Sequence, residues 1–171
     1  MSASEEAEEH VHHAQQPFDK FVAGTMAIIA ALLAIVSVLG LHFISEQLLN
    51  QQKNSDQWAF YQAKNIRHYS AQVARDLLLQ AKAGPDLIGK YAKDIARYDK
   101  DMQDIQEKAK EFEKERDIDS RRADRFHVGE VFLEVAIVLS SLAILTKRKS
   151  WYTAGIASAI TGLVAAATAF A

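Results

Sequence analysis

FVAGTMAIIAALLAIVSVLGLHFI, residues 21–44, is the stretch that decides the fold, because none of its side chains is charged. As a helix, these roughly 24 residues would extend about 36 Å, enough to cross a hydrocarbon core of about 30 Å with some tilt. A cleaved signal peptide is the competing interpretation, but it would have a basic flank and a shorter apolar core. The flank here is acidic, so residues 21–45 are predicted to form a retained transmembrane helix.

Two further segments are apolar enough to be membrane spans. The first, residues 128–146, contains Glu130 and Glu134 and is ended by the basic turn at 147–150. The second, residues 151–170, is uncharged and rich in small side chains. Four of these recur at four-residue spacing and would let a neighbouring helix approach closely: Ala154, Ser158, Gly162 and Ala166. The sequence therefore predicts three transmembrane helices.

Residues 46–127, between the first two spans, are predicted to form a long helical hairpin. In its second half the apolar residues alternate at spacings of four and three, which is typical of a coiled-coil seam: Tyr91, Ile95, Tyr98, Met102, Ile105, Ala109 and Phe112. The first half has a looser apolar stripe: Ala59, Ile66, Tyr69, Val73 and Leu77. The turn at 83–86, Ala-Gly-Pro-Asp, separates the arms, because Gly suits a helix C-cap and Pro cannot continue the helix before it. The predicted fold class is all-α, with three transmembrane helices and a long antiparallel coiled-coil hairpin inserted between the first and the second.

Composition argues against several classes of function. The 20 basic residues nearly balance the 22 acidic ones, which gives no indication of a nucleic-acid partner, and the absence of cysteine excludes disulfides and thiolate chemistry. The sequence has no Gly-rich phosphate loop, no His-Glu-x-x-His and no nucleophile–base pair at a useful spacing, so we predict neither an enzyme nor a cofactor. Residues 1–20, with His10, His12 and His13, are interpreted as an acidic, flexible tail, and metal binding is the alternative.

Titratable residues gather where the hairpin should meet the membrane. His42 and Glu46 follow the first span, and His127, Glu130 and Glu134 lie at the start of the second. Ordinary interfacial placement competes here with a metal site formed by His42, Glu46, His127 and Glu130, and with a pore or proton path through Glu130 and Glu134. A carboxylate such as Glu134, about one turn inside the hydrocarbon, is unfavourable unless it is paired, protonated or wet.

One stretch of the first arm resembles a family signature. The segment NSDQWAFYQAKNIR, residues 54–67, is similar to the D-Q-W-x-x-Y-Q-A-K core of the bacterial membrane family called domain of unknown function 4337. The resemblance implies this architecture, including two closing spans and the basic turn between them, and it implies no activity. The motif residues form either an interaction surface or a polar-aromatic packing layer that fixes register: Asp56, Gln57, Trp58, Tyr61, Gln62, Lys64 and Arg67.

The predicted function is that of a non-enzymatic scaffold or interaction protein in the lipid bilayer. The apolar seam is small for a hairpin of this length. We therefore expect a homo-oligomer formed through the coiled-coil hairpin and the transmembrane helices, with an envelope protein as a candidate partner. The alternative is an oligomeric cation channel or proton pathway. The basic turn places residues 147–150 and the N-terminus in the cytoplasm and the hairpin on the outer side of a bacterial inner membrane.

Overall fold

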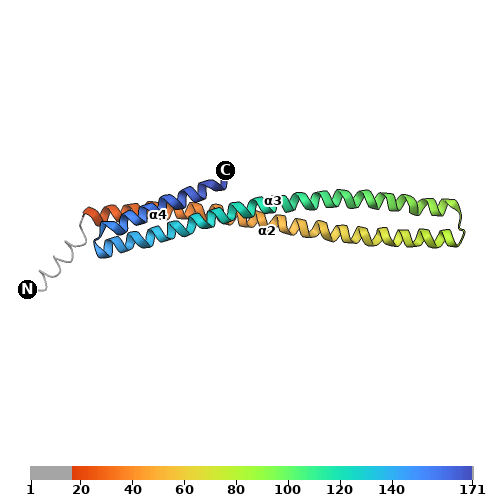
Figure 1. The fold of residues 1–171 in the computed structure, drawn as a ribbon, viewed down its shortest axis with the longest axis horizontal. Helices are drawn as coiled ribbons and strands as arrows, with labels where there is room; N and C mark the ends of the chain where they lie inside the picture. Colours follow the sequence, from red (N-terminus) through yellow and green to blue (C-terminus); the bar gives the residue numbers. More distant parts are fainter. Residues whose placement is uncertain (1–16, 171) are drawn as a thin grey trace, which may run out of the picture. The chain divides into compact units, whose positions relative to one another are not determined.

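The computed structural model describes residues 17–170, and all of the secondary structure in this range is helical. Helix α2 spans Pro17–Gln80, α3 spans Pro85–Thr146 and α4 spans Lys149–Ala167, followed by a short 3-10 helix, η1, at Thr168–Phe170 (Figure 1). The predicted all-α class is therefore confirmed. The histidines of the predicted tail lie outside the described residues, whereas residues 17–20 already belong to α2.

Each of the three long helices contains a stretch that is long and apolar enough to cross a membrane, in agreement with the three predicted spans. The chain divides into two compact units. We call residues 17–44 together with 120–170 the bundle unit, and Ser45–Asp119 the arm unit.

Aromatic and aliphatic side chains from all of its helices form the core of the bundle unit. Ile29 and Val36 of α2 pack with Leu133 of α3 in one buried cluster. At one end of this core the ring of Phe43 stacks on Phe126, with centroids 5.5 Å apart. The ring of Phe170 meets Phe43 and Phe126 edge-on, at 6.4 and 5.5 Å. These contacts attach η1 to both α2 and α3.

Helices α3 and α4 touch backbone to backbone through glycine. A Cβ built on Gly129 would lie 2.8 Å from the carbonyl oxygen of Gly162, and one built on Gly162 would lie 2.7 Å from that of Gly129. The buried face of α4 consists of Gly155, Ala159, Gly162 and Ala166. The predicted ladder has Ala154 and Ser158 in place of the first two, because a strict four-residue step drifts around a helix that has 3.6 residues per turn.

In the arm unit, residues 45–80 of α2 contact residues 85–119 of α3. The contacts run in opposite chain directions, since Asn50 meets Asp119 whereas His68 meets Asp99. All seven predicted seam positions of α3 are buried or half-buried, with Ala109 fully buried and Ile95 8% exposed. The looser stripe of α2 does not face α3: Ile66 is 67% exposed and Val73 is 60% exposed.

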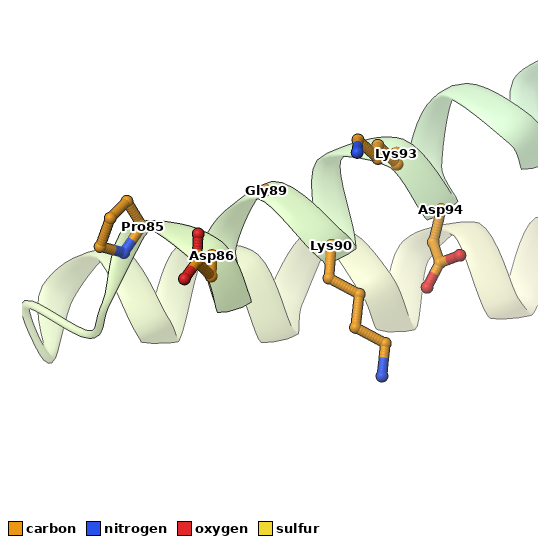
Figure 2. Close-up of a pocket in the computed structure, with 6 residues that line it drawn as sticks. All are labelled: Pro85, Asp86, Gly89, Lys90, Lys93 and Asp94. Carbon is orange, nitrogen blue, oxygen red and sulfur yellow. The ribbon is translucent and has the colours of Figure 1, made fainter.

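The turn between the arms lies at residues 81–84, slightly before the predicted 83–86. Lys82, not Gly84, takes the left-handed conformation after α2, with a φ of 50°. Gly84 instead precedes α3, and its carbonyl oxygen accepts the backbone N–H groups of Leu87 and Ile88. Pro85 then occupies the first helical position, where its missing N–H leaves no helical hydrogen bond unmade (Figure 2).

Candidate functional site

A row of polar side chains on α2 joins the two helices of the arm unit. We call Asn50, Asn54, Lys64 and His68 the polar seam; all four contact α3. Asn54 is 7% exposed and donates from Nδ2 to the backbone oxygen of Ala109 at 2.7 Å. Asn50 donates from Nδ2 to Asp119 Oδ2 at 3.2 Å. Buried amides with partners of this kind allow one register and penalise others.

Two contacts with carboxylates of α3 continue the seam toward the turn. Lys64 Nζ lies 2.5 Å from Asp101 Oδ2 and 5.4 Å from the centre of the Tyr98 ring. The hydrogen bond from Lys64 is the main cause that lowers the pKa of the Asp101 carboxyl below its usual value. His68, which is buried, lies with Nε2 3.0 Å from Asp99 Oδ1.

The sequence contains a signal for this seam that the apolar pattern alone does not reveal. Seven α2 positions alternate at spacings of four and three, in step with the seam of α3, and all are buried or half-buried: 50, 54, 57, 61, 64, 68 and 71. Most of them are polar, so a search for apolar residues misses the set. Asn50, Asn54 and His68 were missed for this reason.

The structure divides the predicted motif between two faces of α2. Gln57, Trp58, Tyr61 and Lys64 are half-buried, and the rings of Trp58 and Tyr61 meet edge-on at 5.6 Å. Asp56, Gln62 and Arg67 are exposed. One half of the motif therefore belongs to the packing layer of the arm unit, and the other half is available to a partner.

In the bundle unit, Glu130 is held by groups of its own chain. Ser37 Oγ donates a short hydrogen bond to Glu130 Oε1, and His127 Nδ1 lies 3.7 Å from Glu130 Oε2. Glu134, one turn further along α3, is exposed and has no hydrogen-bond or ion-pair partner among residues 17–170. The two carboxylates that the sequence grouped together thus have different surroundings.

The four weak metal candidates do not converge on a site of the usual kind. Within residues 17–170, no group of three or more His, Cys, Asp or Glu side chains is placed to hold a metal ion. His42 is exposed and its ring lies 5.4 Å from that of Phe43, while Glu46 is half-buried in the arm unit.

One surface hollow lies at the start of α3. It is about 410 Å³ in volume and is lined by Pro85, Asp86, Gly89, Lys90, Lys93 and Asp94. Figure 2 shows that these residues all come from one helix. The hollow is therefore an open surface of α3 with mixed charge rather than an enclosed pocket.

A comparison with protein families found a match that covers nearly all of the described chain. The model of a domain of unknown function, DUF4337, matches residues 18–171. The chain belongs to the DUF4337 family. The resemblance carried by residues 54–67 is therefore confirmed, and the match covers both units of this DUF4337 protein. No curated protein and no solved structure matched the chain.

Proposed function

We propose that this DUF4337 protein is a non-enzymatic, homo-oligomeric scaffold of a bacterial inner membrane. Its bundle unit crosses the bilayer three times, and its arm unit is an antiparallel coiled-coil hairpin that contacts other envelope components. The three long apolar helices support the membrane part of this proposal. The contacts of the polar seam support the hairpin.

The observation that carries the proposal is the pair of opposite faces on α2 of the arm unit. The polar seam is engaged with α3, while an apolar stripe points away from it. Ile66, Tyr69, Val73 and Leu77 are each about 60% exposed or more, and they line one shallow hollow of about 530 Å³. Exposed apolar patches of this kind mark protein interaction sites. Because α2 contacts α3 mainly through polar side chains, its apolar stripe stays available to partners.

Light scattering of the detergent-solubilised protein tests the oligomer. The expected result is a protein mass of at least two chains, where one chain has a mass of 19.0 kDa. A mass of one chain would refute the homo-oligomer. The apolar stripe is tested by Val73→Glu, which should lower the capture of envelope proteins from membranes. The matched control is Gln103→Glu, which adds the same charge at an exposed position of α3 and should leave the capture unchanged.

The proposed orientation has the hairpin on the outer side. In the bundle unit, Lys147 donates to Asp19, so the start of α2 and the basic turn lie at the same end of this unit. Short basic turns favour the cytoplasm. A cysteine at Gly84 is easily accommodated, since an added Cβ would meet no atom within 4 Å. It should react with a membrane-impermeant maleimide on intact cells whose outer membrane is made permeable, and protection would reverse the orientation.

The exposed carboxylate of Glu134 supports a second candidate, a cation channel or proton pathway in the oligomer. Glu130 supports it less, because Ser37 and His127 of the same chain already contact its carboxylate. Ion flux through liposomes containing the full chain tests this candidate. The flux should fall in Glu134→Gln, and an unchanged flux would exclude a pathway through Glu134.

A further inference from the structure

Helix α3 has two faces of the same period in the bundle unit. Six positions are buried at spacings that alternate between three and four: Phe126, Gly129, Leu133, Ala136, Ser140 and Ala143. A second set with alternating spacings of four and three lies on roughly the opposite side and is exposed: His127, Val131, Glu134, Val138, Ser141 and Leu145. We call this second set the outer seam.

The outer seam has the composition of a helix-packing face. Its apolar members recur every seven residues, with Val131 at 44%, Val138 at 59% and Leu145 at 80% exposure. The polar members His127, Glu134 and Ser141 recur every seven residues between them. A repeat of this period lets two helices pack along their whole length in a left-handed supercoil, and polar side chains at alternate layers fix the register.

Lipid is a poor occupant of this face. Counted from residue 128, Glu134 lies about 9 Å along a helix that crosses the membrane. A carboxylate in hydrocarbon is disfavoured, and intramembrane carboxylates face protein or water. The occupant of the outer seam must therefore offer a hydrogen-bonding group at the depth of Glu134 and apolar groups one layer to either side.

We infer that the outer seam of α3 is the face through which a second copy of this chain packs in the membrane. Identical helices in parallel place equal residues at equal depth, so Glu134 meets Glu134 and Val138 meets Val138. The pattern of polar and apolar layers is then complementary to itself. Facing carboxyl groups hydrogen-bond through a shared proton. This inference rests on the proposed homo-oligomer and names its interface in the membrane.

Disulfide cross-linking of the full chain in membranes tests the interface, because the chain contains no cysteine. Single cysteines at Val131 and Val138 report on the outer seam. Ile35 and Ile28 of α2 are matched controls, at 58% and 63% exposure. They lie at depths similar to those of Val131 and Val138, because the contact between Ser37 and Glu130 fixes which residues of α2 and α3 lie side by side. We expect covalent dimers from the two seam variants several-fold in excess of the controls.

The contribution of Glu134 is tested in the Val138→Cys background. Hydrogen bonds between transmembrane helices contribute about 0.6–1.7 kcal/mol, so Glu134→Val should lower the association constant about 3- to 20-fold. Glu134→Gln keeps a hydrogen-bonding side chain and should retain most of the cross-linking. Helical content measured by circular dichroism shows that each variant is folded.

Three results would overturn the inference in distinguishable ways. Equal cross-linking at seam and control positions, with an oligomeric mass in solution, would mean that copies associate through another face, and the scaffold proposal would stand. No cross-linking and a monomeric mass would remove both the inference and the proposed homo-oligomer. Seam cross-linking that is unchanged in Glu134→Val would remove the role of the carboxyl group.

Discussion

Replacement of Gly129 with Ala is expected to weaken the packing of α3 against α4. The added Cβ would lie 2.8 Å from the carbonyl oxygen of Gly162 and 2.9 Å from Ala166 Cβ. Neither atom is the end of a flexible side chain, so the two helices must move apart by about 0.5 Å to restore ordinary contact distances. Gly24, also in the bundle unit, provides a matched control, because a Cβ there would meet nothing within 4 Å.

The size of the expected loss in stability follows from the number of atom pairs that move apart. A helix interface with on the order of 50 atom pairs gains 0.1–0.2 kcal/mol from each, and a gap of 0.5 Å removes about a quarter of that attraction. The expected loss is roughly 1–3 kcal/mol, in the range measured for overpacked cores. Exchange of Gly for Ala also favours the helix by up to about 1 kcal/mol. Since both variants gain this helix stabilisation, the difference in the free energy of unfolding between Gly129→Ala and Gly24→Ala measures the loss of packing alone.

Unfolding in mixed micelles, as the fraction of dodecyl sulfate rises, measures this difference. In a Trp58→Phe background the single remaining tryptophan is Trp151, which lies in α4 and reports when that helix separates. Gly129→Ala should unfold at a lower fraction of dodecyl sulfate than Gly24→Ala. Equal unfolding midpoints for the two variants would refute the close approach of α3 and α4.

Three further predictions concern the arm unit. The hydrogen bond from Lys64 lowers the folded-state pKa of Asp101. The stabilisation from this pair is therefore present above the unfolded-state pKa and is lost as the pH falls through the folded-state pKa. The difference in melting temperature between the wild type and Asp101→Asn should narrow over that acidic range. Asn54→Ala should reduce the free energy of unfolding by about 1–2 kcal/mol, since it removes a buried hydrogen bond, and unchanged thermal unfolding would contradict this. Val73→Glu should leave the helical content intact because Val73 is 60% exposed, whereas Ala71→Glu should reduce it because Ala71 is 5% exposed. Equal circular dichroism spectra of the two variants would contradict the assignment of faces.

Several features followed from the sequence because they depend on local properties of the chain. The apolar stretches at 21–44, 128–146 and 151–170 and the Gly84-Pro85 break are sufficient to predict three long helices, each with an apolar stretch, and a turn within a few residues of its observed place. The alternating apolar positions of the second arm predicted which face of α3 is buried, since side chains three and four apart lie on one side of a helix. The motif at 54–67 predicted the family.

Other features depended on which helices meet, and only the tertiary structure decided them. The apolar stripe of α2 has a helical period, but period alone does not tell which neighbour it faces; α2 turns its polar side to α3 because Asn50, Asn54 and His68 find partners there. Glu130 and Glu134 look alike in the sequence, yet their positions around α3 bring one to Ser37 and leave the other exposed. The sequence determined the helices and their apolar lengths, because these follow from each residue and its near neighbours. The tertiary structure decided which face of each helix packs against other helices of the same chain, because this depends on contacts between residues far apart in the sequence.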